Sequence, residues 1–369
     1  MNKIIARILL SVLGLALAFS CVRRPLEEPS EAIAVSVKVN VNAVTNVNTN
    51  IRNSVHLYGT ANALWDEKLA QLDPQMMRVL VYDPDTDRLL TQSFVSSSSV
   101  DEDGNKVFNG TLGISHGTYN FLVYNFDTPT TQVDDINTES SIIAYTDEIS
   151  PGLKAKYLGT KAGDESATPN PYDDMHIHYE PEHLLVANHR DIRISPHDTL
   201  VVIHTEASSV IDTYYLQVSV EGLQFASTAT AVISGLSPSN RIGLNKRTDE
   251  PSSAVIFEMH KGQDTAIEGE NKDILCAVFN TFGKIKDSSS DLYVTFNVYD
   301  TAGNLLKYTA SLDAIFETEL AIKNHWLIID EKYMQIVIPD PGQDKPKEGN
   351  GGFQPQVDDW EEEHGEIEI

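Results

Sequence analysis

Hydrophobic and polar residues alternate along several short stretches of the chain. The clearest are IAVSVKVNV (33–41), TYYLQVSVE (213–221) and LYVTFNVY (292–299). Successive side chains of a β-strand point to opposite faces, so this spacing predicts strands with one face in a core and the other in water. In the first stretch the core-facing residues run from Ile33 to Val41 at every second position. In the other two they are Tyr214, Leu216, Val218, Val220, Leu292, Val294, Phe296 and Val298.

Other runs are apolar almost throughout, which is typical of strands buried on both faces. They are MMRVLVYD (76–83), TYNFLVYNF (118–126), TLVVIHT (199–205), ILCAVF (274–279) and MQIVIP (334–339). Turn-forming sequences such as DEDGN (101–105) and TAGN (301–304) lie between runs of this kind. Helical periodicity is weak and occurs in LWDEKLAQL (64–72) and LDAIFETEL (312–320). The pattern predicts an all-β fold made of antiparallel β-sandwiches.

A polar, proline-containing stretch at 160–182 predicts a long loop between two domains. We therefore expect an N-terminal β-sandwich domain at 31–183 and a C-terminal one at 184–338. A linker rich in glycine, proline and charge follows at 339–352. The last segment, 353–369, regains apolar residues, and our hypothesis is a strand that docks on its own domain or on a neighbour. These residues are Phe353, Val357, Trp360, Ile367 and Ile369.

The start of the chain has the pattern of an export signal, with two basic residues and then an apolar run at 8–19. This run is shorter than the roughly 20 residues of a membrane-spanning helix. Ser20 and Cys21 follow it, an order that resembles the lipobox of bacterial lipoproteins. That resemblance implies a lipoprotein signal peptide at 1–20, a membrane-proximal stem at 21–30, and acyl chains such as palmitate on Cys21 that attach the protein to a membrane. The alternative is an ordinary signal peptide cut near Ser20, which would leave a free thiol.

The chain is strongly acidic, with 54 Asp and Glu against 27 Lys and Arg and a formal net charge of −27. A field of this sign repels nucleic acid and anionic lipid, so neither is an expected direct partner. The only cysteine besides Cys21 is Cys276, in the apolar run ILCAVF. We interpret Cys276 as a small hydrophobic core residue.

Motifs with catalytic or metal-binding chemistry are weak. GISHG (113–117) matches the nucleophile elbow of α/β hydrolases at Ser115, but a strand follows where that motif needs a helix, so we predict a hairpin turn instead. His176, His178 and His183 in HIHYEPEH could ligate zinc, although no fourth ligand stands at a recognised spacing and a polar loop is the favoured interpretation. We expect no catalytic residues, no bound metal and no cofactor.

Two further binding hypotheses follow from composition. DPDTD (83–87) and DEDGN (101–105) resemble parts of calcium loops, but neither has a glutamate at the twelfth position, and acidic turns account for both. Trp65 or Trp326, stacked with neighbouring tyrosines in a shallow cleft, would form a sugar-binding surface, although scattered tryptophans belong more often to a core.

Several motifs together resemble the fimbrillin-associated lipoproteins of Bacteroidetes. They are the lipobox followed by RRPLEE and an amphipathic strand, the block from MMRVLVYDPDTDRL to GTYNFLVYNFDT, the segment HTEASSVIDTYYLQVSVEGLQFASTATAVISGLSPS (204–239), and the terminal VDDWEEEHGEIEI. The resemblance implies two transthyretin-like β-sandwiches in tandem. It also implies a non-enzymatic structural or adhesion lipoprotein of the cell outer membrane, exposed at the surface as a subunit or anchor of a fimbria.

The same resemblance implies assembly by β-strand donation between fimbrial subunits. Strand 31–41 is then the element whose removal opens a groove, and the tail 353–369 is the strand to be donated. In this family stalk subunits are cleaved after an arginine that follows the first strand. Arg52, before Asn53, stands at such a position. An anchor would stay uncut, with Cys21 still joined to its strand. The expected partners are the membrane, other fimbrial subunits, and a host or glycan ligand. The alternative function is a surface glycan-binding lipoprotein.

Overall fold

The computed structural model describes residues 32–40, 73–126, 128–158, 175–249, 251–264, 272–285 and 292–342, and helical positions 64, 66 and 68. Nearly all regular structure in these ranges is β-strand, which confirms the prediction of an all-β sandwich fold. No helix of the described ranges is both long enough and apolar enough to cross a membrane.

Two sheets enclose the N-terminal core. The strands of the first sheet are β1 (Ile33–Asn40), β4 (Ser98–Val100), β5 (Lys106–Ile114) and β11 (Leu200–Glu206). The strands of the second are β2 (Met77–Tyr82), β3 (Leu89–Val95), β6 (Gly117–Asn125), β10 (Leu185–Ile194) and β12 (Ser208–Ser209). Their spatial orders are β11-β1-β5-β4 and β12-β10-β6-β2-β3. Val35, Val79, Phe108, Phe121 and Ile203 are buried between them.

The N-terminal sandwich extends beyond the domain boundary that the sequence placed at residue 184. β10 pairs with β6, and β11 pairs with β1, although both strands follow that boundary. The physical reason is packing, because Leu185 and Ala187 of β10 fill the same core as Phe121 of β6. Before β10 the chain has already visited the other sheets with β7, β8 and β9, and after β12 it does not return to the two sheets of this sandwich.

A larger sheet encloses the C-terminal core. Its strands are β9 (His176–His178), β13 (Asp212–Glu221), β14 (Ala226–Leu236), β17 (Ser253–Asp264), β18 (Lys272–Thr281), β19 (Tyr293–Asp300), β20 (Leu305–Ser311), β21 (Trp326–Ile329) and β22 (Gln335–Val337). The main order is β20-β19-β14-β17-β18-β13-β21, with β22 also on β13 and β9 on β17. β17 pairs with β14 through residues 253–259 and with β18 through 260–264, so the sheet folds over its own core.

The alternating stretches have the predicted orientation. All eight residues expected to face a core at 213–221 and 292–299 lie in the C-terminal core, which confirms that prediction. The opposite faces of β13 and β19 differ from expectation, because Tyr215 and Gln217 on β13 and Thr295 and Asn297 on β19 are buried rather than exposed to water. Tyr215 packs with Cys276 and Trp326 in a separate apolar cluster on the outside of the sheet.

A small sheet joins the two halves of the chain. It contains β7 (Thr131–Asp134), β8 (Ile143–Thr146), β15 (Ser239–Arg241) and β16 (Lys246–Arg247), in the order β16-β15-β8-β7. Ala144 of β8 packs with Leu80, Tyr82, Leu122 and Tyr124 on the outer face of the second N-terminal sheet. β2 and β6 are therefore buried on both faces, as their continuous apolar runs predict.

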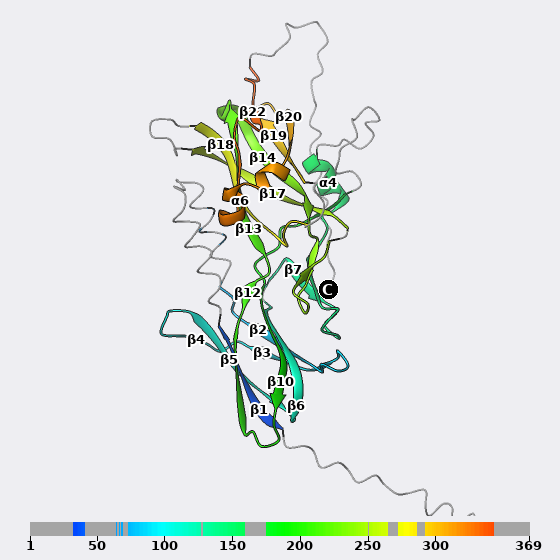
Figure 1. The fold of residues 1–369 in the computed structure, drawn as a ribbon. Coiled ribbons are helices and arrows are strands. Elements are labelled where there is room, and N and C mark those ends of the chain that lie inside the picture. The colour runs from blue at the N-terminus through cyan, green and yellow to red at the C-terminus, as the bar shows by residue number, and fades with distance from the viewer. Residues whose placement is uncertain are drawn as a thin grey trace, which may run out of the picture.

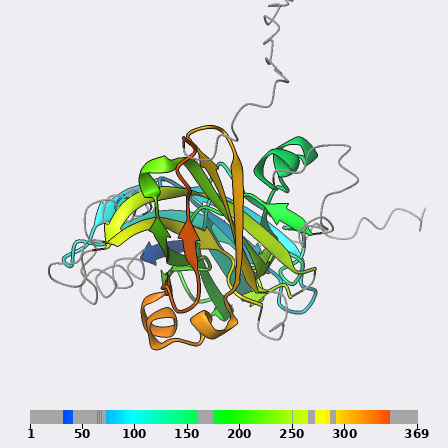
Figure 2. The same ribbon diagram turned by 90° about the horizontal axis from the view of Figure 1, so that it is seen from above.

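Figure 1 shows the two groups of strands stacked along the long direction of the molecule, with β7 and β12 between them. Seen along that direction in Figure 2, the strands of the C-terminal half lie over those of the N-terminal half. The helical elements are α4 (Pro151–Leu158), η1 (Leu223–Phe225), α5 (Asp313–Phe316) and α6 (Glu319–Asn324). The helical stretch predicted at 312–320 is thus divided between α5 and α6.

Two of the runs predicted to be deeply buried are not. β11 alternates, with Leu200 58% and Val202 42% exposed and Ile203 buried, because one face of its sheet is open to solvent. In β22 only the central Ile336 is buried. The runs at 76–83, 118–126 and 274–279 form β2, β6 and part of β18 and are buried as predicted.

Candidate assembly site

β1 lies in the interior of its sheet and is paired on both sides. It runs antiparallel to β5 from Ile33 opposite Ile114 to Asn40 opposite Val107. On its other side it runs parallel to β11, from Ala34 opposite Leu200 to Asn40 opposite Glu206. Removing β1 would leave unpaired backbone donors and acceptors along β5 and β11, which is the property of a sheet edge that accepts another strand.

The side chains of β1 also fill the N-terminal core. Val35 is fully buried and Ile33 is 8% exposed, and both belong to the cluster that contains Phe108, Ile114 and Ile203. Burial of one such aliphatic side chain contributes roughly 1.5–3 kcal/mol to folding. β1 is therefore an integral part of the described fold, held by its hydrogen-bond ladders and by its core contacts.

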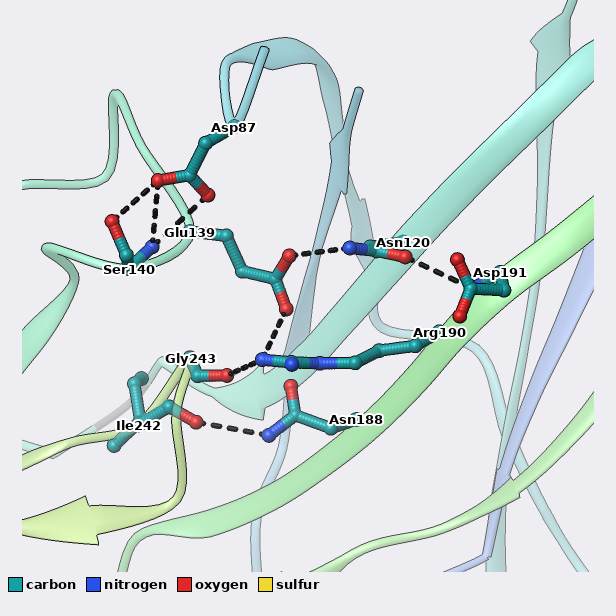
Figure 3. Close-up of polar contacts among 9 residues, drawn as sticks. All are labelled: Asp87, Asn120, Glu139, Ser140, Asn188, Arg190, Asp191, Ile242 and Gly243. Carbon is teal, nitrogen blue, oxygen red and sulfur yellow. Dashed lines mark hydrogen bonds and ion pairs between the residues drawn. The ribbon is translucent and has the colours of Figure 1, made fainter. Parts of the chain in front are cut away.

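A second cluster of functional interest holds the two halves together around Glu139 (Figure 3). The Glu139 carboxylate is 7% exposed, accepts a hydrogen bond of 2.6 Å from Asn120 Nδ2, and forms an ion pair of 2.9 Å with Arg190. Asn120 Oδ1 in turn accepts a hydrogen bond from the Asp191 backbone N–H at 2.9 Å. A buried carboxylate needs such partners, since an isolated buried charge is costly.

Arg190 and Asn188 of β10 connect this cluster to the chain after β15. Arg190 donates a hydrogen bond of 2.6 Å to the Gly243 carbonyl, and Asn188 Nδ2 donates one of 2.9 Å to the Ile242 carbonyl. Gly243 lies so close to the backbone of Glu139 that an added Cβ would be 1.9 Å from its carbonyl oxygen. The two halves of the chain therefore meet here through direct backbone contact as well as through hydrogen bonds.

Asp87 fixes the loop that presents Glu139. Its carboxylate accepts hydrogen bonds from the Ser140 backbone N–H and hydroxyl, and its carbonyl accepts one from the Glu139 N–H. Asp87 and Asp191 both have positive φ, at 60° and 55°. Sequence reasoning missed this cluster, because its members come from separate loops and strands. The one available signal was the presence of aspartates at turns, since aspartate tolerates a positive φ better than most residues.

Most residues that the sequence proposed for lipidation, cleavage and strand donation lie outside the described residues. This applies to Cys21, to Arg52 and Asn53, and to the tail residues Phe353, Val357, Trp360, Ile367 and Ile369. Of the assembly elements, the structure places β1, and it describes the chain as far as Gly342.

Ser115 stands in a turn between sheets, so the hairpin prediction for GISHG is wrong. β5 ends before Ser115 and pairs with β1 and β4, whereas β6 begins at Gly117 and pairs with β2 and β10. Tyr119 Oη donates to the backbone carbonyls of Ser115 at 3.0 Å and His116 at 3.2 Å, which closes the corner. The segment after the turn is a strand, as expected, and not the helix of a nucleophile elbow.

The three histidines of HIHYEPEH have separate surroundings. His176 Nδ1 is 2.9 Å from Glu148 Oε2, and His178 Nδ1 is 2.8 Å from the Thr146 carbonyl oxygen. Both lie on β9, where the sequence predicted a polar loop. His183 is buried, and burial together with the charge of Lys68 lowers its pKa to about 4. Within the described ranges no three His, Cys, Asp or Glu side chains group in a way that could hold a metal ion.

The acidic turns are closed by their own hydrogen bonds. Asp83 accepts hydrogen bonds from the backbone N–H of Asp85 and Thr86, and Asp101 accepts them from the N–H of Asp103 and Asn105 and from the Asn105 side chain. These bonds to the charged form lower the pKa of both aspartates. The interpretation as acidic turns therefore has a structural basis.

Trp326 and Cys276 are core residues. Trp326 is 3% exposed and its ring centroid lies 4.8 Å from that of Tyr215, so it offers no surface for stacking a sugar. Cys276 is fully buried beside them, and burial raises the pKa of its thiol to about 11. A thiol of that pKa is inert at neutral pH. Trp65 lies outside the described residues.

These features define the class: an all-β sandwich protein whose β1 is enclosed between two neighbouring strands and whose halves share a small sheet. Residues 63–258 match the family described as Domain of unknown function (DUF5119), and the chain belongs to that family.

The chain is also similar to individual proteins of Bacteroides ovatus and Porphyromonas gingivalis. A Bacteroides ovatus protein, named as a candidate fimbrium anchoring subunit, Fim4B, is 23% identical over 320 residues, or 80% of this chain and 85% of that protein. A crystal structure of a candidate adhesin from Bacteroides ovatus matches this chain with a TM-score of 0.53 at 18% sequence identity. The match covers 88% of this chain and 98% of the adhesin chain, which supports a shared fold. The fimbrial anchor protein Mfa2 from Porphyromonas gingivalis has a TM-score of 0.43 at 10% identity over 81% of this chain and 89% of its own.

Proposed function

We propose that this chain is a non-enzymatic subunit that anchors a cell-surface fimbria, held at the outer membrane by lipid on Cys21. The observation that carries the proposal is the enclosed β1, paired with β5 on one side and β11 on the other. The name of the similar Bacteroides ovatus protein, a candidate fimbrium anchoring subunit, gives independent support.

β1 occupies the position that a donated strand would take. A subunit that accepts a donated strand needs a vacant position between β5 and β11, because main-chain hydrogen bonds supply the affinity of strand addition. In this chain β1 fills that position and Val35 fills the core beneath it. A subunit that keeps this strand, uncut after Arg52, is suited to end a fimbria at the membrane, where it donates its tail 353–369 to the next subunit and accepts none.

A matured stalk subunit is the alternative within the same class of proteins. Cleavage after Arg52 would release β1 together with Cys21, and so would open the groove and detach the lipid. The alternative glycan-binding function had its sequence basis in exposed tryptophans, and the burial of Trp326 removes one of the two candidates.

The two cysteines allow a direct genetic test. We expect cells that carry Cys21→Ala to shed fimbriae into the medium, because the acyl chains that attach the subunit to the membrane are absent. Cys276→Ala is the matched control, since this buried thiol has a packing role and the fimbriae should stay on the cells. Fimbriae could be counted by electron microscopy of cells and of medium. Full retention of fimbriae by the Cys21→Ala cells would overturn the proposal.

A further inference from the structure

A pocket of ≈ 430 Å³ lies where the two halves of the chain meet, apart from β1. Ser209 and Val210 line it from the end of the N-terminal sandwich, and Asn240 and Lys246 line it from β15 and β16. The volume is within the range of about 300–1,000 Å³ that is typical of small-molecule sites. Sites of this kind occur preferentially at interfaces between domains.

The pocket is basic although the chain as a whole is acidic. Lys246, Arg247 and Lys284 line it, against one acidic residue, Asp249. In a chain with a formal net charge of −27, three cations in one concave site would concentrate a small anion locally. This charge balance points to a ligand with a negative group.

Arg247 has a fixed structural position in the wall. Its guanidinium forms an ion pair of 2.6 Å with Asp212, and it lies against Gly283, where an added Cβ would be 2.3 Å from Arg247 Cζ. Asp212 thus neutralises Arg247. Lys284 Nζ lies 5.6 Å from the ring centroid of Phe316. Within the described residues neither Lys246 nor Lys284 has an acidic partner at ion-pair distance. Lys246 and Lys284 are therefore the cations left to meet an anion.

Asn240 supplies an unpartnered polar group at the same place. The residue is 3% exposed, lines the pocket, and has an Oδ1 atom with no hydrogen-bond partner among the described residues. A buried acceptor without a donor costs about 1–3 kcal/mol. This Oδ1 atom is closed to solvent, so a ligand would contact Asn240 through the other atoms of its side chain. Asn245 and Ser209 add further uncharged polar groups to the lining.

We propose that this pocket binds a monosaccharide unit with an acidic group. Lys246 and Lys284 would contact the acid, and Asn240, Asn245 and Asp249 would exchange hydrogen bonds with the hydroxyls. The lining residues include no aromatic side chain, so the stacking on which neutral sugars depend is missing and the charge must supply the affinity. The proposal rests on this pocket alone and does not depend on the anchoring function.

Titration of the full-length protein with defined sugars tests the proposal. Isothermal calorimetry at low salt would use glucuronate as the carboxylate probe, glucose 6-phosphate as the phosphate probe, and glucose as the neutral control. We expect at least one acidic sugar to bind at least tenfold more tightly than glucose, and its affinity to fall as salt is added. Preference for glucuronate would identify a carboxylate site and preference for glucose 6-phosphate a phosphate site. Absence of binding by both acidic sugars, or equal binding of glucose, would overturn the proposal.

Two lysine variants locate the binding in this pocket. Lys246→Ala with Lys284→Ala should weaken binding at least tenfold, whereas Lys332→Ala, at an exposed lysine of the C-terminal half, should leave it unchanged. Nuclear magnetic resonance of the unmodified protein is a second measurement, and it does not require any variant to fold. The side-chain amide signals of Asn240 and Asn245 should shift when the acidic sugar is added. Unaltered affinity in the double variant, or unshifted amide signals, would contradict the assignment.

Discussion

Glu139 shows how single residues hold the two halves of this protein together. Its buried carboxylate is shared between Asn120 and Arg190, and Arg190 also reaches the Gly243 carbonyl. Every polar contact in this group crosses between elements that are distant in sequence. The position of the C-terminal half therefore depends on a close contact between Gly243 and the Glu139 carbonyl oxygen. One added methyl group at Gly243 would disturb that contact.

Gly243→Ala should destabilise the protein by about 1–3 kcal/mol, because the new Cβ would overlap the Glu139 carbonyl oxygen and the backbone must move apart. Urea unfolding monitored by circular dichroism measures the change in the free energy of unfolding. Gly152→Ala is the matched control: it lies in α4, an added Cβ there meets no atom within 4 Å, and it should be neutral or slightly stabilising. Equal effects of the two substitutions would contradict the described contact.

His183 should give the protein a pH-dependent stability. Burial and the charge of Lys68 lower its pKa in the folded protein to about 4, from an ordinary value of 6.5. Between these values the unfolded chain binds more protons, so this contribution to stability is complete above pH 6.5 and is lost as pH falls toward about 4. From pH 7.5 to pH 5 the loss is about 2 kcal/mol.

His183→Leu should reduce the difference in unfolding free energy between pH 7.5 and pH 5 by that amount, because the titrating group is gone. His197→Leu, at an exposed histidine, is the control and should keep the difference of the unmodified protein. Urea unfolding at the two pH values measures both. An unchanged difference in His183→Leu would show that His183 is not buried in its neutral form.

At the scale of elements, β1 is held by two ladders and by the core contacts of its alternate residues. Val35→Asn should destabilise the N-terminal sandwich by about 2–4 kcal/mol, since it removes a fully buried aliphatic side chain and buries an amide. Ala34→Asn, one residue away and only partly buried, should have a much smaller effect. Hydrogen exchange should accelerate in β1 and β5 of the Val35→Asn protein before it does so in β18. Equal acceleration in both variants would argue against an enclosed β1.

The strands themselves could be predicted from the sequence to a large extent. Alternation located the core-facing residues of β13 and β19, and continuous apolar runs located β2 and β6, because burial on one or both faces leaves a direct trace in residue type. β11 was misjudged because an edge strand can expose aliphatic residues at a modest cost. Local patterns also gave no sign of the partner change in β17.

The candidate sites were harder to predict than the strands, because they depend on which strands become neighbours. Nothing in the short sequences of β8 and β15 indicates that they pair, although that pairing brings the chain at Gly243 against the backbone of Glu139. Strand pairing over long sequence separation is a tertiary property. The functional role of strand 31–41 was accessible from the sequence only through the resemblance to a family.

At the scale of the whole molecule, the shared small sheet couples the two cores. β15 and β16 belong to the C-terminal half of the chain, yet β15 pairs with β8, which packs on β2 and β6. We therefore expect one cooperative thermal transition, with a van't Hoff enthalpy close to the calorimetric enthalpy. Differential scanning calorimetry measures both quantities. Two separated transitions would show that the halves unfold independently.

The central claim is that the chain is an anchor that keeps β1 and its lipid. Intact mass and N-terminal peptide mapping of the protein purified from its native envelope test this claim most directly. The account predicts an acylated Cys21 that is still joined through the chain to residues 33–40. A chain that begins at Asn53 would contradict it, because the groove between β5 and β11 would then be open and the lipid lost.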